Sequence, residues 1–376
     1  MTIAISETLD RQQWDDFLTS QPRGHLLQSY EWGELNTYLG GRTHRLAALE
    51  NGRVVGVMQL TVAPVPIPVS IPGLHPTWLY SSRGPTVESP DSPALPALIE
   101  SAHALARRER AVVLRLEPNI ADDDPQMDAW LAAYRGLGFQ TNPIAIHGRR
   151  SWVLDIRPNA EQLLANFKMT WRQNVRVSER KGVTVREAES EADFDAYYQL
   201  LEVTSERDAF FIHSKDYHRE ILRTFAAKGD AVLYLAEHEG EPLAAKMLIR
   251  FGDWCWDMFG ASSNNKRNLK ATYLLQFRCF QWAQSKGCSY FDFRTIPEVL
   301  EPGEEMWGVY EYKKGFGGFS RLNIPTQDYV YRPLIYTAWR KTVEIRRARR
   351  HEERKKVELE RAERGKQVEP EGKQTP

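Results

Sequence analysis

Two adjacent lysines stand among aromatic residues and glycines in the stretch "GVYEYKKGFGG", residues 308–318. Such a setting suggests an anion, or a negative charge that develops during a reaction, which a fixed ammonium group would stabilise. Lys313 or Lys314 is therefore a candidate for that chemistry. The alternative is a β-bulge with an exposed lysine pair, and the glycines at 315, 317 and 318 favour this alternative on composition alone.

A second basic group lies in "KMTWRQNVRVSERKGV", residues 168–183. Arg172 and Arg176 are four residues apart, so they share one face of a helix, and more basic residues follow one turn later. Asn174 interrupts the charge pattern and is a candidate to bind a ligand or the backbone. Such a stripe suits the phosphate groups of RNA or of another ligand, and the alternative is an ordinary exposed helix face.

Motifs for other chemistries are missing from the sequence. It contains no H-E-x-x-H, no G-x-S-x-G and no G-x-x-x-x-G-K-[ST], which are the patterns of zinc hydrolases, serine hydrolases and P-loop proteins. We therefore expect neither a metal ion nor a cofactor.

The elements that must position these groups occur twice along the chain. Strand–turn–strand patterns at 44–62 and 231–251 are each followed by a third strand, a helix and a closing strand, which we expect at 77–87, 94–110 and 111–118 and again at 254–262, 270–287 and 288–296. This repeat predicts two mixed α/β domains of one design. We expect them at 1–148 and 149–337, with the last part of the second packing back on the first, and a charged helical or disordered tail at 338–376.

Composition indicates a globular protein of the cytoplasm. The 376 residues include 50 Lys and Arg against 50 Asp and Glu, so no net field attracts nucleic acid or membrane and any polyanion must be met locally. Three cysteines without C-x-x-C spacing argue against a disulfide framework. The N-terminus has no apolar signal segment, and no apolar run is long enough to cross a membrane.

The repeated unit resembles the Gcn5-related N-acetyltransferase fold, in which three antiparallel strands lead to a helix that receives the phosphates of the acyl donor. Acetyl-CoA enzymes of that fold need glycines in the preceding loop. Here the loop reads "KRNLKATY", with Lys270 where a glycine is needed, and the first copy is acidic and rich in proline. Neither copy suits the pyrophosphate of coenzyme A.

Tandem domains that have lost this loop resemble the FemABX aminoacyltransferases. The motifs are similar to those of that family in type and order, namely "LLQSYEWGELNTYLGG" (26–41), "YSSRGPTVE" (80–88), "LRLEPN" (114–119), the basic segment at 168–183, "GASSNNKRNLKATYLLQF" (260–277) and the stretch at 308–318. The resemblance implies tandem acyltransferase-like domains, each with a mostly antiparallel sheet flanked by helices. It also implies transfer of an amino acid from aminoacyl-tRNA to an amine on a peptidoglycan precursor, with no cofactor.

The resemblance also assigns residues. The family form [LV]-Y-x-[FY]-K-x-G-F-G makes Lys313 and Tyr312 the catalytic pair, with Phe316 behind them among the substrate-binding residues. Arg207, in "TSERDAFF", matches an arginine near precursor phosphates, although a pair with Asp208 or Glu206 is the alternative. The R-G-P turn and the "EP" motif add Arg83 and Glu117 on the acceptor side, and the alternative for Glu117 is a surface acid that ends a strand.

Two alternatives stay open. Members that bind a soluble uridine nucleotide precursor have a lysine four residues after the tryptophan of the entry motif, and Asn36 stands there in this chain. That departure disfavours a nucleotide-linked acceptor and leaves a lipid-linked one, with contact at the inner face of the plasma membrane. The rival functions are an N-acyltransferase acting on a polysaccharide or lipid amine, and a non-catalytic protein that binds RNA or a membrane surface.

Overall fold

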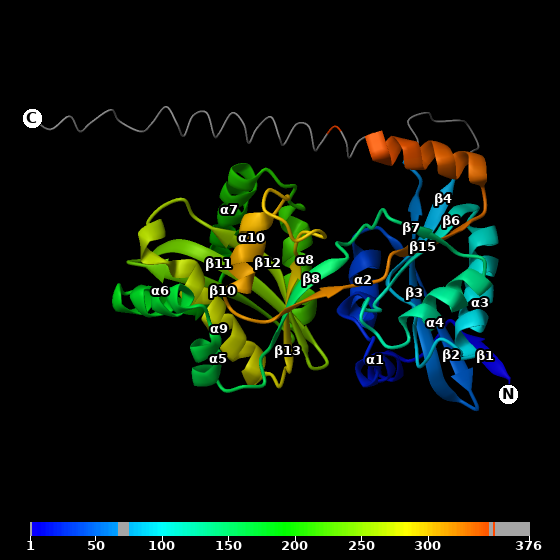
Figure 1. The fold of residues 1–376 in the computed structure, drawn as a ribbon, viewed down its shortest axis with the longest axis horizontal. Coiled ribbons are helices and arrows are strands. Elements are labelled where there is room, and N and C mark those ends of the chain that lie inside the picture. The colour runs from blue at the N-terminus through cyan, green and yellow to red at the C-terminus, as the bar shows by residue number, and fades with distance from the viewer. Residues whose placement is uncertain (1, 67–74, 346–348, 350–376) are drawn as a thin grey trace, which may run out of the picture.

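The computed structural model describes residues 2–66, 75–345 and 349, and the chain forms two halves, each built on one mixed sheet (Figure 1). The first sheet has the order β1 (Ile3–Ser6), β2 (Arg42–Glu50), β3 (Arg53–Pro64), β4 (Thr77–Arg83), β6 (Ala111–Pro118), β15 (Thr326–Val330) and β7 (Gln140–Asn142), with β5 (Thr86–Val87) paired to β3. Its helices are α1 (Arg11–Ser20), α2 (Tyr30–Tyr38), α3 (Ala94–Arg108) and α4 (Met127–Gly136).

The second sheet repeats this plan. Its order is β9 (Thr184–Glu187), β10 (Ala231–His238), β11 (Glu241–Phe251), β12 (Trp254–Ser262), β13 (Tyr290–Thr295), β8 (Arg150–Asp155) and β14 (Phe319–Leu322). Its helices are α5 (Ala160–Asn166), α6 (Met169–Arg180), α7 (Glu191–Asp208), α8 (Lys215–Ala226), α9 (Ala271–Ser285) and α10 (Trp307–Lys314). The predicted mixed α/β class and the predicted strand–strand–strand–helix–strand repeat are confirmed.

Each sheet borrows one strand from the other half of the chain. In the first sheet β15, which comes from the end of the chain, lies between β6 and β7. In the second sheet β8, which directly follows the first half, lies between β13 and β14. The two borrowed strands occupy corresponding places, so the halves exchange equivalent strands. The boundary predicted near residue 148 falls in the connection that takes β8 across.

Local sequence explains the two predicted hairpins. Asn51-Gly52 and Glu239-Gly240 all adopt left-handed backbone angles, with φ of +51°, +82°, +53° and +78°. A two-residue turn with positive φ at both positions matches the twist of antiparallel strands. The β2–β3 and β10–β11 pairs then run along most of their length, with one bulge in each.

A hydrophobic cluster joins the halves. Leu26, Leu27, Trp32 and Leu35 of the first half are buried against α7, α8 and the second sheet. The Trp32 and Phe225 rings lie 6.2 Å apart, and the Lys228 ammonium pairs with the Glu31 carboxylate beside them. Burial of these apolar side chains from both halves in one cluster fixes the relative positions of the two sheets.

The last described helix, over residues 333–345, packs on the first half. Tyr336 and Trp339 are buried with Val112 and Val113, and the Trp339 ring lies 5.3 Å from the Trp78 ring. The sequence had predicted a solvated segment from residue 338, whereas Trp339 anchors its first turns. The rest of that predicted tail lies outside the described residues.

None of the helices within the described ranges combines the length and the apolar character that a membrane span requires.

Candidate active site

The second sheet opens at one point between two parallel strands. β12 and β13 pair only through three positions, Trp254 to Trp256 against Tyr290 to Asp292, although both strands continue beyond them. At the same level β12 carries a bulge, because Met247 faces Phe259 while Leu248 faces Asp257, which leaves Met258 without a partner across the strands. A bulge bends its strand away from a neighbour. The result is a gap between β12 and β13.

Lys313 reaches into this gap from α10. Its side chain is buried, and its Nζ donates a hydrogen bond to the backbone carbonyl of Thr295 at 2.8 Å, beyond the last residue of β13 that pairs with β12. Lys314 instead lies on the outside, where it pairs with Glu311 at 3.7 Å and covers the Tyr310 ring. The predicted segment is therefore a helix and not a β-bulge, and it directs the two lysines to different surroundings.

A buried ion pair lies next to Lys313. Lys246 of β11 and Asp257 of β12 form a direct salt bridge, and both are at most 9% exposed. Burial lowers the pKa of Lys313 to about 7, while the Asp257 carboxylate opposes this shift. The side chain in the gap therefore loses its proton at a much lower pH than an ordinary lysine does. It is available to respond to a new negative charge.

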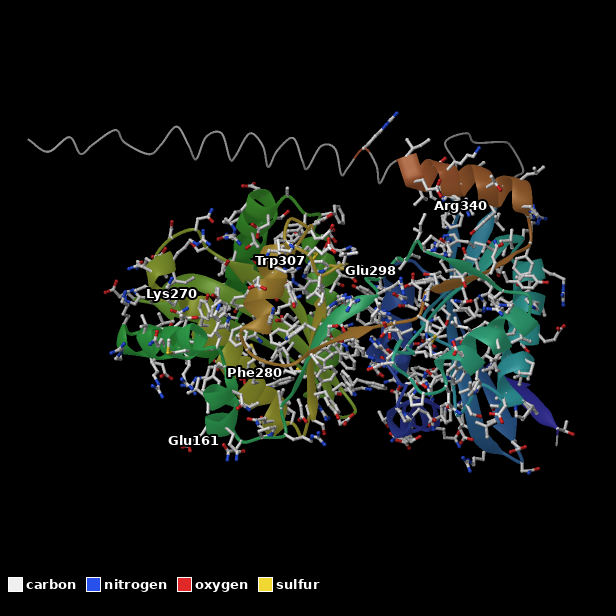
Figure 2. The ribbon with its side chains drawn as sticks, viewed as in Figure 1. Glu161, Lys270, Phe280, Glu298, Trp307 and Arg340 are labelled. Atoms are coloured by element: carbon white, nitrogen blue, oxygen red, sulfur yellow. The ribbon has the colours of Figure 1, made fainter. Side chains whose placement is uncertain are left out.

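Tyr312 and Phe316 hold α10 in position. The Tyr312 hydroxyl donates to the carbonyl of Thr272 at 2.9 Å, and its own carbonyl accepts from the Trp171 indole at 2.9 Å. Phe316 is completely buried among the aromatic rings of the second core, which include Phe280 (Figure 2). The prediction that Phe316 contacts substrate is therefore wrong, because its ring has no exposed surface. The geometry gives Tyr312 a positioning role in place of the predicted catalytic one.

The opposite face of the second sheet looks onto the first half across a narrow pocket. We call it the junction pocket, and it is lined by Gly24, His25, Arg83, Asn119, Ser151, Trp254, Trp256, Asp292, Arg321 and Asn323. The space open to water-sized groups is about 20 Å³, enough for a single small polar group. Because Asp292 is the last residue of β13 that pairs with β12, this pocket and the Lys313 gap lie at the same level of the sheet on its two faces.

Arg83 lines the junction pocket, and its role in binding the acceptor remains a prediction. It has a left-handed backbone with φ of +59°, and its guanidinium donates to the Gly148 carbonyl at 2.8 Å. With the Asn323 amide oriented to satisfy both of its groups, that side-chain oxygen accepts from Arg83 at 2.7 Å. Burial, with a contribution from Arg83, lowers the pKa of His147 to about 3, so the imidazole is neutral.

Glu117 does not face this pocket. It is 4% exposed, and its carboxylate accepts from the Tyr80 hydroxyl at 2.6 Å and from the His147 backbone N–H at 3.2 Å. The backbone N–H of Ile146 is a further donor to it. The carboxylate thus holds the connection between β7 and β8. The predicted contact with an acceptor amine is corrected to a structural role, because its oxygens are already used.

The predicted basic stripe lies on the side of the second half away from the first (Figure 1). On α6, Arg172 donates to the Ala165 carbonyl at 3.0 Å, Arg176 is exposed, and Asn174 bonds to Tyr273 of α9. Lys181 bonds to the Asn268 carbonyl at 3.3 Å, which brings the stripe to the loop before α9.

That loop adds two more cations to the stripe. Lys270 adopts a φ of +60°, the left-handed conformation that a glycine would favour at this position, and Arg267 lies one short turn before it. The side chains of Arg176, Arg267 and Lys270 have no ion-pair or hydrogen-bond partner in the part of the chain that the structure describes. Figure 2 shows Lys270 beside α6.

Arg207 stands at the C-terminal end of α7. Its guanidinium pairs with the Asp208 carboxylate at 3.0 Å and donates to the Ser262 carbonyl at 3.0 Å at the end of β12. The internal partner predicted as the alternative is therefore present. Phosphate binding by Arg207 remains a prediction that would require this pair to open.

Several groups of the site escaped the sequence analysis. Lys246, Asp257, Asp292, Arg294 and Arg321 belong to no motif that spacing could identify. The signal that would have found Asp257 and Lys246 is a charged residue inside an otherwise apolar strand, since buried charges in strands are rarely tolerated without a partner.

A wider groove of about 460 Å³ lies at the far edge of the second sheet, over β9, β10 and α9. Its lining includes Glu187, Arg278 and Lys286 but none of the groups that surround Lys313 or the junction pocket. We therefore do not assign the site to it.

Comparison with known proteins agrees with this architecture. The FemAB family model matches residues 9–241 and 236–344. Among curated relatives, the lipid II:glycine glycyltransferase of Staphylococcus saprophyticus is 25% identical over 393 residues, which covers 86% of this chain and 92% of the relative. The enzyme of the same name from Staphylococcus aureus strain USA300 is 25% identical over 401 residues, covering 87% and 93%.

Solved structures show the same fold. The crystal structure of FemX superposes with a TM-score of 0.80 at 23% identity, covering 90% of this chain and 99% of that one. A tandem Gcn5-related acetyltransferase protein from the clavulanic acid pathway gives a TM-score of 0.50 at 13% identity, covering 88% and 98%. The predicted tandem acyltransferase-like fold is confirmed, and because the family model spans most of the chain, the protein belongs to the FemAB family.

Proposed function

We propose that the protein is an aminoacyltransferase that moves an amino acid from aminoacyl-tRNA to an amine on the stem peptide of a peptidoglycan precursor. The observation that carries the proposal is the Lys313 ammonium, which is buried in the gap between β12 and β13. The names of the relatives, lipid II:glycine glycyltransferases, support the class of reaction and the class of acceptor.

The reaction needs no covalent enzyme intermediate. The acceptor amine attacks the ester carbonyl of the aminoacyl-tRNA, the new C–N bond forms, and negative charge develops on the carbonyl oxygen. The C–O bond to the ribose then breaks, and the proton lost by the amine is taken up by the ribose oxygen. Lys313, which is already desolvated, stabilises the oxyanion electrostatically. An amide is more stable than the ester, so this step consumes no ATP.

The two faces of the second sheet divide the substrates in this proposal. The donor approaches from the face of α6 and α9, where Arg176, Arg267 and Lys270 offer unpaired charge to the RNA backbone. The acceptor approaches from the junction pocket, between the two halves. Both reach the same level of the sheet, and holding them there supplies the entropic part of catalysis.

The acceptor in this proposal is lipid-linked. Asn36 of α2 is a neutral amide, so it offers no charge to the diphosphate of a soluble nucleotide precursor. The relatives are named for lipid II, which agrees with that choice. The protein would then work in the cytoplasm at the inner face of the plasma membrane, where charged tRNA and a lipid-linked precursor meet.

The test is direct reconstitution. Purified protein is mixed with lipid II and each aminoacyl-tRNA in turn, and the product is identified by mass spectrometry. We expect one amino acid to be added, with loss of activity in Lys313→Met and retention in Lys314→Ala, its exposed neighbour. Absence of transfer from every aminoacyl-tRNA, together with acylation of another amine by another donor, would overturn the proposal.

A further inference from the structure

The junction pocket contains hydrogen-bond donors that the protein itself does not use. The guanidinium of Arg321 lines it and stacks over the Trp254 ring at 5.6 Å, but it has no hydrogen bond or ion pair to any residue that the structure describes. Trp256, 4% exposed, lines the same pocket, and its indole N–H is buried without a partner. An unused buried donor such as the Trp256 indole is costly, and the partly exposed Arg321 guanidinium beside it is free to bind the same group, so a ligand that accepts from both is expected.

His25 adds a third donor. Its Nδ1 accepts from the Leu27 backbone N–H at 3.0 Å, and burial lowers the pKa of the imidazole, so the ring is neutral and its proton lies on Nε2. The tautomer is set by the Leu27 hydrogen bond. Within the described ranges Nε2 has no protein partner, and the His25 ring lies 5.1 Å from the Trp256 ring.

The charge at the pocket is positive. Arg83 and Arg321 line it and Arg294 lies close by, where its only side-chain hydrogen bond in the described structure is to the Met258 sulfur at 3.2 Å. Asp292 is the one carboxylate in the lining, and none of the three arginines forms a salt bridge with it among the described residues. Asp124, another acid that acts on Arg321, is held by Arg23 at 2.7 Å.

One acceptor accompanies these donors. Asp292 receives the Arg294 backbone N–H on Oδ1 at 2.6 Å, and its second oxygen is left for a donor on a ligand. A phosphodiester has no donor to give, so it would leave this oxygen of Asp292 unused. The end of a peptide offers a carboxylate for the arginine and an amide N–H for Asp292, and its planar carboxylate matches the fork of a guanidinium.

We propose that the junction pocket binds the C-terminal carboxylate of the acceptor peptide, with Arg321 as its principal ligand and Asp292 as the acceptor for the terminal amide N–H. This proposal deepens the proposed function and rests on it. Trp256 and His25 complete the set of donors, and Arg83 fixes one wall through Gly148 and Asn323. The small volume of the pocket suits a single carboxylate.

The experiment compares an acceptor with its own amide. Binding of N-acetyl-L-lysyl-D-alanyl-D-alanine and of its C-terminal carboxamide to the full-length protein is measured by calorimetry, and both are also tried as acceptors of transfer. We expect the wild type to prefer the acid by about 10- to 100-fold, because a charge-assisted hydrogen bond is lost with the amide. Arg321→Gln should remove that preference and raise KM for the acid while leaving kcat within a few-fold.

Two controls keep the result interpretable. Arg321→Lys retains the charge without the fork and should keep a reduced preference, and Arg53→Gln, an exposed arginine of the first half, should behave as wild type. Thermal unfolding of each variant checks that it is folded. A folded Arg321→Gln that still prefers the acid would overturn the proposal.

The remaining outcomes separate this proposal from the proposed function. Competition by inorganic diphosphate, with no distinction between acid and amide, would make the pocket a phosphate site and would also overturn it. Preference for the acid in binding, together with no transfer from any aminoacyl-tRNA and acylation by another donor, would support the pocket and refute the function.

Discussion

The two sheets share one topology, but only one of them opens. In the first sheet the parallel pair β4–β6 extends from Thr77 opposite Ala111 to Arg83 opposite Pro118. In the second sheet the equivalent pair β12–β13 ends after three positions. The gap that admits Lys313 therefore exists in one half alone. A duplicated fold can keep its architecture in both copies while an opening between the same two strands, the proposed site of chemistry, is kept in one.

The closed half has acquired a different use. With no gap between β4 and β6, its strand ends serve as a wall of the junction pocket, to which Arg83 contributes. Glu117, near the end of β6, is buried, and its carboxylate accepts hydrogen bonds from the backbone N–H groups of Ile146 and His147. Under the proposed function, substitutions in the open half should therefore reduce catalysis, whereas substitutions in the closed half should reduce stability.

The largest effect is expected from Lys313→Met. Loss of a positioned donor to an oxyanion reduces kcat by about 100- to 1,000-fold, measured as the initial rate of transfer at saturating acceptor. Lys314→Ala is the matched control, since its side chain lies outside the gap. Equal losses in both variants would mean that the gap is not the reaction site.

Asp257→Asn should have the next largest effect. It leaves the Lys246 ammonium buried without its counter-ion, and removal of one partner of a buried pair costs about 3–5 kcal/mol. We expect that loss in denaturant unfolding, with kcat lower by about 10-fold through displacement of Lys313. Asp155→Asn, which breaks a largely exposed pair with Arg157, is the control and should change neither quantity much.

The pH dependence sharpens the assignment to Lys313. Burial lowers its pKa from the usual 10.5 to about 7, so between these values the unfolded chain binds a proton that the folded protein lacks. The free energy of unfolding should therefore rise as the pH increases from about 7 towards 10.5, and Lys313→Met should remove this rise. In the same window the wild-type kcat should fall, because the ammonium is the form that stabilises an oxyanion.

Glu117→Gln should affect stability and spare catalysis. The loss of charge weakens the hydrogen bonds to the β7–β8 connection, at a cost of about 1–3 kcal/mol in unfolding. The value of kcat should stay within a few-fold of wild type. A large fall in kcat with unchanged stability would restore the acceptor-amine role that the sequence suggested.

The smallest effect concerns the donor side. Arg176→Gln should weaken binding of tRNA by only a few-fold at low salt, and it should reduce the slope of log affinity against log salt by about one. Filter binding over a range of salt concentrations measures both. An exposed arginine on the opposite half, Arg53, provides the control.

Much of the fold could be predicted because turn residues and the alternation of apolar residues within short segments determine it. The turns at Gly52 and Gly240, the alternation in the flanking strands and the order of elements in each repeat all appear in the structure. Lys313 was found because its neighbours form a distinctive stretch of aromatics and glycines. The helix over that stretch was not predicted, because the glycines favoured a β-bulge. In the structure Gly317 and Gly318 lie just beyond the last turn of α10, with φ of +87° and +98°.

The rest depends on contacts that no local pattern records. Lys246 and Asp257 meet because β11 and β12 are adjacent and a bulge shifts their register. Asp292 and Arg321 line one pocket because β8 lies between their strands. The internal partners of Glu117 come from residues about 30 positions further on. Phe316 looked like a site residue because it follows the lysines, yet it turns inward to the core.

The exchange of β8 and β15 also bears on how the molecule is made. The place between β6 and β7 in the first sheet can be filled only when residues 326–330 have been synthesised. While the chain is being synthesised from its N-terminus, the edge of β6 that later pairs with β15 would therefore stay unpaired through most of translation. All strands of the second sheet have been made once residue 322 has been synthesised, so the first sheet, although its chain emerges earlier, is the one that must be completed last.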